Sequence, residues 1–347
     1  MAGPGTASRH DAVREALRRQ PRRWLVTGAA GFIGSHLVET LLALDQHVTG
    51  LDNLATGHRR NLEQVRDAVG PAAWSRYVNI EGDIVELDDC RRATTGADYV
   101  LHHAALGSVP RSIEDPLATH AANATGFLNM LVAARDAGCA RFVYAASSST
   151  YGDHPGLPKV EDEIGRPLSP YAATKYINEL YADAFGRCYG LGSIGLRYFN
   201  VFGPRQDPNG PYAAVIPRWA LALSQGQACE IFGTGETTRD FCFVANVVQA
   251  NLLAACCDAS ATNAVYNVAV GTRTSLNTVY DMLREAVGAR VPAARALRPQ
   301  YRPPRQGDIQ DSQADISQAQ TRLGYRPSHT VAQGLALSVG SFLEEAA

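Results

Sequence analysis

The chain has 347 residues, 46% of them hydrophobic, which is enough to bury a large core in one large domain with a smaller lobe or in two interleaved domains. Its 32 Lys and Arg residues nearly balance 34 Asp and Glu residues, and a net charge of -2 gives no broad positive field, so we expect no nucleic-acid partner. The seven cysteines show no C-x-x-C pair, which indicates reduced core residues and no metal site. No apolar run resembles a secretory leader or a membrane span, so we expect a cytoplasmic protein without a membrane partner.

Strands and helices alternate through the first half of the chain. A short helix at residues 12–19 is expected to pack against the core, within an N-terminal extension over residues 1–20. Short apolar runs predict strands at residues 24–27, 48–51, 77–80, 99–101 and 141–144. Amphipathic stretches predict helices at residues 32–44, near Asp88 and at residues 116–137. This alternation predicts an α/β fold, a Rossmann-like doubly wound parallel sheet with helices on both faces.

The second half of the chain has a different character. A helix at residues 171–189 and a strand at 194–198 continue the alternation, but loops rich in Pro and Gly follow from Gly203. The loop at residues 151–170 is long enough to be expected beside a site. A buried helix at residues 241–255 is expected to return to the sheet. We therefore expect a Rossmann domain made of residues 21–200 and 241–268. A smaller α/β lobe, expected to bind the substrate, would comprise residues 201–240 and 269–347.

A glycine-rich turn lies where the first predicted strand of the sheet becomes a helix, which is the context of a dinucleotide fingerprint. Gly28 permits a tight turn, Gly31 lets a pyrophosphate approach the backbone, and Gly34 allows the helix to pack closely on the sheet. Free N–H groups at the helix start would meet the diphosphate. Because the spacing departs from G-x-G-x-x-G by one residue, a tight turn without a ligand is an equal alternative for this segment alone.

Two acidic residues at strand ends favour the dinucleotide interpretation. Asp52 follows the second strand, where its carboxylate would accept both adenosine ribose hydroxyls and repel a 2′-phosphate, so we expect NAD rather than NADP. Asp83 follows the third strand and is placed to meet the adenine amine, with Ile84 against the ring; an acidic helix N-cap is the alternative for Asp83. Arg59 and Arg60 are expected in a solvated loop.

Tyr171 and Lys175 stand four residues apart on a predicted helix and therefore share one face. The chain holds only two lysines, so we expect chemistry at Lys175 that arginine cannot supply, namely a compact ammonium that lowers the pKa of the neighbouring phenol. A solvated pair on an amphipathic helix is the alternative. Ser147 ends a predicted strand close by. Together these residues predict a phenolate that takes a proton from a sugar hydroxyl while the attached carbon gives its hydride to NAD, with Ser147 relaying the proton.

Several segments together resemble the extended short-chain dehydrogenase/reductase family, namely residues 27–34, 102–105, 147–149, 171–175 and 197–203. Within that family the chain is most similar, from about residue 11 onward, to bacterial UDP-N-acetylglucosamine 4-epimerases of the polysaccharide-precursor type. The resemblance implies a cycle in which NAD oxidises C4 of the sugar, the 4-keto intermediate presents its other face, and the same hydride returns.

The resemblance also implies a set of site residues. The catalytic residues are Ser147, Tyr171 and Lys175. The NAD-binding residues are Gly28, Gly31, Phe32, Ile33, Gly34, Asp52, Asn53, Thr56, Gly57, Asp83, Ile84, His103, Ala104, Tyr171 and Lys175. The residues that bind the UDP-N-acetylhexosamine substrate are Gly107, Ser108, Ser147, Ser148, Ser149, Tyr171, Asn200, Gln206, Ala214, Val215, Arg239, Arg305, Asp308 and Ser312.

Two positions bear on the substrate. Arg239 and Arg305 suit a diphosphate, because a guanidinium donates paired hydrogen bonds to phosphate oxygens, although either residue is equally compatible with a surface charge. Ser312 stands where relatives confined to non-acetylated sugars carry a bulky Tyr, so its small side chain leaves room for an acetamido group without requiring one. Asn246 replaces the family's usual Asp, whose role is normally structural.

Three other functions are compatible with parts of the pattern. A sugar-nucleotide 4,6-dehydratase would carry acids where this chain has Ser147-Ser148-Ser149, so we set it aside. A UDP-glucuronate 4-epimerase keeps a similar catalytic set and is the main alternative. A non-catalytic NAD-binding sensor or scaffold is the third. The helices at 116–137 and 171–189 resemble those that form a dimer interface in relatives, which favours a homodimer, although their apolar faces are also compatible with a core.

Overall fold

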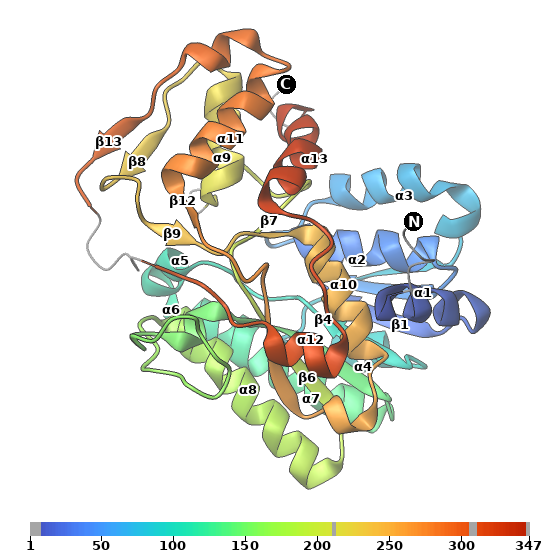
Figure 1. The fold of residues 1–347 in the computed structure, drawn as a ribbon. Helices are drawn as coiled ribbons and strands as arrows, with labels where there is room; N and C mark the ends of the chain where they lie inside the picture. Colours follow the sequence, from blue (N-terminus) through green and yellow to red (C-terminus); the bar gives the residue numbers. More distant parts are fainter. Residues whose placement is uncertain (1–7, 210–212, 305–310, 345–347) are drawn as a thin grey trace, which may run out of the picture.

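A parallel β-sheet forms the centre of the molecule in the computed structural model, which describes residues 8–209, 213–304 and 311–344. Within these ranges seven strands pair in the order β11-β6-β5-β4-β1-β2-β3 (Figure 1). They are β1 Arg23–Thr27, β2 His47–Asp52, β3 Tyr77–Glu81, β4 Tyr99–His102, β5 Arg141–Ser147, β6 Ser193–Tyr198 and β11 Ala264–Val268. The chain order reverses between β1 and β4, so their carboxyl ends form the switch point at which such sheets bind ligands. The predicted fold class is confirmed.

Helices cover both faces of the sheet (Figure 1). On one face lie α1 Arg9–Arg19, α2 Phe32–Ala43, α3 Arg59–Trp74 and α10 Val244–Ala255. On the other lie α4 Leu87–Thr94, α6 Pro116–His120, α7 Gly126–Asp136 and α8 Pro170–Tyr189, with the π-helical turn Ala121–Thr125 joining α6 to α7. Strand β1 serves both layers, because Trp24 and Val26 pack into one hydrophobic cluster and Leu25 into the other.

A smaller lobe sits beyond the carboxyl edge of the sheet (Figure 1). It has its own apolar core, in which Trp219, Tyr280 and Phe342 are fully buried or nearly so. Its helices are α9 Val215–Ser224, α11 Leu276–Gly288 and α13 Val331–Glu344. Short strand pairs join its loops: β7 Val201–Phe202 with β10 Cys242–Phe243, β9 Thr238–Arg239 with β12 Thr274–Ser275, and β8 Glu230–Phe232 with β13 Gln300–Arg302. The remaining short elements are α5 Val109–Glu114, α12 Ser317–Leu323 and the 3-10 turns Ser148–Tyr151, Ala259–Ala261 and Pro292–Ala296.

The structure corrects two details of the predicted elements. Arg59 and Arg60 do not lie in a loop but begin α3, where Arg59 pairs with Glu81. Gly70 and the proline after it interrupt the helical pattern of α3 in the sequence, and the helix has a kink with positive φ at Gly70. The predicted helix at 241–255 begins only at Val244, because the preceding residues form β10. The proposed division into two domains stays a prediction.

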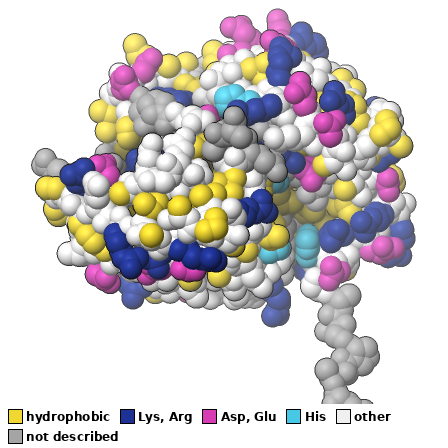
Figure 2. Space-filling model, turned by 90° about the horizontal axis from the view of Figure 1, so that it is seen from above, with side chains coloured by type: hydrophobic (Ala, Val, Ile, Leu, Met, Phe, Trp, Pro, Cys, Tyr) yellow, Lys and Arg dark blue, Asp and Glu magenta, His cyan; other side chains and the backbone are white. Residues whose placement is uncertain are grey.

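The N-terminal helix α1 is held to the body of the protein. A capping box between Ser8 and Asp11 begins it. Leu17 is buried in the core cluster, and the carbonyl oxygen of Leu17 accepts a hydrogen bond from Gln46. Among the described residues no helix is both long and apolar enough to traverse a lipid bilayer. Positive and negative side chains are interspersed on the face that Figure 2 shows, in keeping with the small net charge.

Candidate active site

The glycine turn between β1 and α2 has the geometry of a phosphate-binding loop. Gly28 adopts a φ of 68°, and a Cβ there would stand 2.8 Å from the amide nitrogen of Ala104. A Cβ on Gly34 would stand 1.9 Å from the carbonyl oxygen of Gly28, so Gly34 packs on the turn itself rather than on the sheet. Gly31 is the N-cap of α2 and offers no side-chain cap, which leaves the first N–H groups of the helix for an anion.

The Asp52 carboxylate lies beside this turn at the end of β2. Its Oδ2 atom accepts a hydrogen bond from the amide of Ala30 at 2.9 Å, and its Oδ1 atom accepts one from the amide of Leu54 at 2.8 Å. Burial raises the pKa of this carboxyl above its ordinary value, and the two N–H donors oppose the rise. The carboxylate is thus fixed in place by backbone donors at the rim of a pocket.

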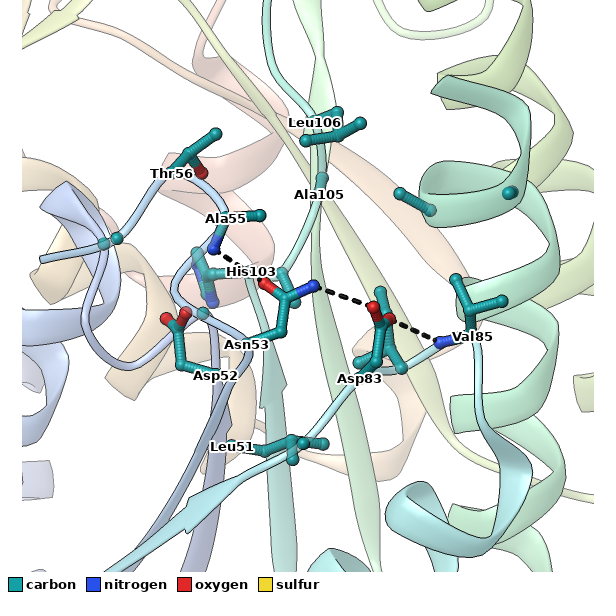
Figure 3. A pocket seen from close by; sticks show the side chains of 18 of the residues that line it. Leu51, Asp52, Asn53, Ala55, Thr56, Asp83, Val85, His103, Ala105 and Leu106 are labelled. Atoms are coloured by element: carbon teal, nitrogen blue, oxygen red, sulfur yellow. Dashed lines mark hydrogen bonds between the residues drawn. The ribbon is translucent and has the colours of Figure 1, made fainter. Parts of the chain in front are cut away.

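Asp83, at the end of β3, lies opposite Asn53 (Figure 3). The Asn53 amide donates to Asp83 Oδ2 at 2.8 Å, and the backbone N–H of Val85 donates to Asp83 Oδ1 at 2.9 Å. Helix α4 begins at Leu87 with Glu86 as its N-cap, so the alternative that Asp83 caps this helix is wrong. Asp83 instead fixes the loop that forms one wall of the pocket.

These groups border a pocket of about 300 Å³ at the carboxyl ends of β1 to β4 (Figure 3). Ten of the predicted NAD-binding residues line it: Gly28, Gly31, Asp52, Asn53, Thr56, Gly57, Asp83, Ile84, His103 and Ala104. The side chains of Phe32 and Ile33 pack instead against the apolar core of the smaller lobe. A glycine-lined turn, free helix N–H groups and a fixed carboxylate suit the diphosphate and ribose of a dinucleotide.

Ser147 and Tyr171 meet at the end of β5. The Ser147 hydroxyl is close enough to the Tyr171 phenol to lower its pKa. Ser147 Oγ also accepts hydrogen bonds from the backbone N–H of Ser149 at 3.2 Å and from its hydroxyl at 2.8 Å. The strand end therefore places the Ser147 hydroxyl near the phenol, and its catalytic role stays a prediction.

The start of α8 holds Tyr171 and Lys175 in place. Ser169 caps the helix by accepting a hydrogen bond from the amide of Ala172 at 3.1 Å. The Lys175 ammonium is 4% exposed, lies 5.9 Å from the centre of the Tyr171 ring, and donates to the carbonyl oxygen of Ala145 at 2.9 Å. The buried position excludes the alternative of a solvated pair on the helix surface.

The pKa of the Tyr171 phenol departs from the prediction. Burial raises this pKa above its ordinary value, and the hydrogen bond from Ser147 is the opposing influence. The expectation that Lys175 makes the phenol acidic is therefore not met by the protein alone. Burial in turn lowers the pKa of Lys175 to about 8, so at neutral pH the ammonium still carries its charge.

A second pocket, of about 510 Å³, begins at the serine triplet and extends toward the smaller lobe. It is lined by six of the predicted substrate residues: Ser147, Ser148, Ser149, Asn200, Arg239 and Ser312. Its other wall comes from the loop at 151–170, whose length predicts a position beside a site but does not identify the residues that line it. Those that line the pocket are Tyr151, Gly152, Asp153, His154, Pro155, Leu157, Lys159 and Leu168.

The remaining predicted substrate residues lie outside this lining. Ser108 is the N-cap of α5 and accepts a hydrogen bond from the amide of Arg111 at 3.3 Å. Gln206 donates to the carbonyl oxygen of Val201 at 3.1 Å. The others are Gly107, Tyr171, and Ala214 and Val215 at the start of α9, whereas Arg305 and Asp308 fall outside the described residues.

Asn246 and the pair Arg197–Glu179 make structural contacts. Asn246 bonds with the backbone of His329 at 2.9 Å and 3.1 Å, in keeping with the structural role expected at that position. Arg197 and Glu179 form a buried ion pair, with nitrogen to oxygen distances of 2.9 Å and 2.7 Å.

Among residues 8–209, 213–304 and 311–344, no cluster of His, Cys, Asp and Glu could hold a metal ion.

Comparison with known proteins defines the class. Residues 24–269 match the NAD dependent epimerase/dehydratase family, so the chain belongs to this family. The resemblance to extended short-chain dehydrogenases is confirmed. The chain is an NAD-dependent enzyme, and its glycine turn and Asp52 supply a site that fits this cofactor.

Proteins named as UDP-sugar 4-epimerases are among its relatives. A UDP-glucose 4-epimerase from Mycolicibacterium smegmatis is 37% identical over 92% of this chain and 98% of its own. A UDP-N-acetylglucosamine 4-epimerase from Methanobrevibacter ruminantium, solved with UDP-N-acetylmuramic acid, is 36% identical over 94% of this chain and 99% of its own, with a TM-score of 0.85. A UDP-glucuronic acid 4-epimerase from Bacillus cereus, solved with UDP-glucuronic acid and NAD, is 28% identical over 93% and 99%, with a TM-score of 0.82.

Proposed function

We propose that this chain is a UDP-sugar 4-epimerase whose main substrates are UDP-N-acetylglucosamine and UDP-N-acetylgalactosamine, with weaker use of UDP-glucose and UDP-galactose. One observation supports the proposal above the others. Ser147 and Tyr171 lie close together at the strand end where the sugar pocket begins, with the buried Lys175 beside the phenol. This arrangement supports Tyr171 as the group that exchanges a proton with a sugar hydroxyl.

The chain's own residues would move one proton in each direction. Tyr171 Oη takes the proton of the sugar 4-hydroxyl, and Ser147 donates a hydrogen bond to the same oxygen as its charge develops. Bound NAD, held by the glycine turn and Asp52, would supply the hydride acceptor for C4 and a positive charge that favours the phenolate. The phenol later returns the proton to the oxygen of the 4-keto sugar after the other face has been presented. No net oxidation occurs.

The preference for an acetylated sugar rests on the second pocket. Ser312 lines it with a small side chain, which leaves room for an acetamido group. Arg239 lines the same pocket and suits a phosphate oxygen of the nucleotide. The relative from Methanobrevibacter ruminantium, whose name specifies UDP-N-acetylglucosamine, supports the same choice.

We further propose that the protein is a homodimer that works in the cytoplasm and supplies polysaccharide precursors. Large apolar side chains are exposed on α5, α6 and α8: Ile113 is 65% exposed, Leu117 82% and Leu180 53%. Such side chains on neighbouring helices are typical of a surface covered by a partner.

Product analysis tests the proposal. Purified protein would be incubated separately with UDP-N-acetylglucosamine, UDP-glucose and UDP-glucuronate, and the 4-epimers resolved by chromatography. We expect the highest kcat/KM with UDP-N-acetylglucosamine, and a loss of about 10²–10⁴-fold in Tyr171→Phe with NAD still bound. Preference for the uronate would instead establish the UDP-glucuronate 4-epimerase alternative, which relatives from Arabidopsis thaliana represent at 32% identity. A wild-type protein that is no more active than Tyr171→Phe on any of the three sugars would favour the scaffold hypothesis.

A further inference from the structure

The chain's second lysine, Lys159, is also buried. All other cationic side chains among the 32 are arginines, and both lysines are buried, Lys175 at 4% and Lys159 at 8% exposed. Lys175 belongs to the catalytic set. Lys159 belongs to no predicted site, yet it lines the sugar pocket together with Ser148 and Ser312. A second lysine retained in the wall of the same pocket calls for a chemical explanation.

Backbone hydrogen bonds fix Lys159 next to Ser312. Its N–H donates to the carbonyl oxygen of Gln313 at 2.8 Å, and its carbonyl oxygen accepts from the amide of Asp315 at 2.9 Å. The Asn267 amide donates to the same carbonyl oxygen at 2.9 Å. This residue of the 151–170 loop is thereby paired with the segment that carries Ser312, the position proposed to make room for an acetamido group.

The ammonium of Lys159 is only partly satisfied. It donates to the carbonyl oxygen of His154, and within the described parts of the chain no carboxylate forms an ion pair with it. Burial lowers its pKa, with no charged neighbour contributing. An ammonium has three donors, so two remain for other acceptors. The buried guanidinium of Arg197 differs, because Glu179 neutralises it at 2.7 Å.

The charges around the pocket favour a neutral acceptor over an anionic sugar. Asp153 and Asp311 line the same pocket as Lys159 and Arg239, so the described part of its lining carries two carboxylates against two cations. A uronate carboxylate would meet no excess of positive charge there. An acetamide carbonyl oxygen is a strong acceptor without a charge of its own, and it satisfies an ammonium donor that a sugar hydroxyl satisfies less well.

We propose that the Lys159 ammonium donates a hydrogen bond to the acetyl carbonyl oxygen of the N-acetylhexosamine. Lys159 then selects the acetylated sugar, whereas Ser312 only admits it. This inference rests on the proposed 4-epimerase function and names a specificity-determining residue for it. Lys159 takes no part in the proton transfer at C4.

The test compares Lys159→Met with wild type on UDP-N-acetylglucosamine and UDP-glucose. We expect kcat/KM for the acetylated sugar to fall roughly 10-fold to 100-fold, mainly through a higher KM, and that for UDP-glucose to change less than about threefold. Arg91→Met is the matched control, because it removes a cation that is 53% exposed, pairs with Asp88 and lies outside the pocket lining; kcat/KM for both sugars should stay as in wild type.

Several outcomes would overturn the inference while leaving the epimerase function intact. These are an equal loss with both sugars, no loss with either, or a loss confined to UDP-glucuronate. Thermal unfolding would reveal whether Lys159→Met fails to fold. In that case Lys159→Gln is the second variant, because its amide retains a neutral donor for His154. Its kcat/KM for the acetylated sugar should fall by less than the roughly 10-fold expected for Lys159→Met, and an equal fall with both sugars would again contradict the inference. A wild-type protein that epimerises none of these sugars would overturn the proposed function itself.

Discussion

The two pockets are built in different ways. The pocket that fits the dinucleotide draws on residues 28–122, and most of its geometry comes from backbone at the carboxyl ends of four adjacent strands. The sugar pocket joins residues 147–168 to Asn200, Arg239 and the pair 311–312, and side chains from loops of both lobes form its walls. The cofactor site is thus a property of the sheet, whereas the sugar site is a property of how distant loops are fixed together.

The largest effect should come from the backbone of the cofactor side. In Gly34→Ala the new methyl group would lie 1.9 Å from the carbonyl oxygen of Gly28, so the turn must open. We expect a loss of at least about 3 kcal/mol in the free energy of unfolding and no NAD in the purified protein. Denaturant unfolding and acid release of NAD measure the two effects.

Gly107→Ala is the control on the sugar side. A Cβ at Gly107 meets nothing within 4 Å, so stability and NAD content should match wild type. If Gly34→Ala retained NAD at wild-type stoichiometry, the contrast between a backbone-built and a loop-built pocket would fail.

A smaller effect is expected at the residue that fixes the loops of the sugar pocket. The Asp240 carboxylate is fully buried and accepts hydrogen bonds from the amides of Val270 and Gly271 at 3.0 Å and of Ala314 at 3.2 Å. Asp240→Ala leaves these donors without their acceptor, so we expect a loss of about 2–3 kcal/mol in stability.

For Asp240→Ala the measurement compares kcat/KM for the sugar nucleotide with the NAD content of the folded protein. The kcat/KM for the sugar nucleotide should fall while NAD content per folded molecule stays unchanged, because the three amides that bind the Asp240 carboxylate belong to segments on the sugar side. A variant that lost NAD in proportion to activity would show that the two pockets are not independent.

The smallest effect is a gain in stability on removing Lys175. Its folded-state pKa of about 8 is below the ordinary 10.5 of an unfolded lysine, so the buried charge destabilises the fold below pH 8. As pH rises through 8 toward 10.5 the folded form loses its charge first and this cost disappears. NAD-free Lys175→Met should therefore be about 1–2 kcal/mol more stable than wild type at pH 7, after allowing for the lost bond to Ala145.

Urea unfolding between pH 7 and pH 10 checks this prediction, and the difference between variant and wild type should shrink over that range. A difference that stays constant would mean that Lys175 is not desolvated as the structure indicates. The variant should have lost its epimerase activity, since a residue that costs stability is retained for its chemistry.

Local patterns predicted the elements that a sheet organises by itself. The glycine turn, Asp52 at the end of β2 and Ser147 at the end of β5 are all placed by strand ends, so a strand assignment located them. Lys159 could not be found in this way, because its place depends on pairing with residues 313–315. The sequence signal for Lys159 is the rarity of lysine in this chain, a signal that Lys159 shares with Lys175.

The pKa of Tyr171 shows a second limit of sequence reasoning. Spacing on α8 correctly brought Tyr171 and Lys175 to one face, but spacing does not report burial, and burial decides the direction of both pKa shifts. The sequence pattern did not predict helix α3, because Gly70 interrupts its helical periodicity. Its buried apolar side includes Val65.

Strand β11, the last of the central sheet in chain order, follows residues 201–240, the first segment of the smaller lobe, in the sequence. Because β11 pairs with β6 along its length, a fragment ended near residue 200 would leave the backbone donors and acceptors of β6 open on one side. It would also uncover the apolar face that α10 shields. Such an open edge invites pairing between molecules, so the nucleotide-binding half is not separable by a single cut and excising it would favour aggregation.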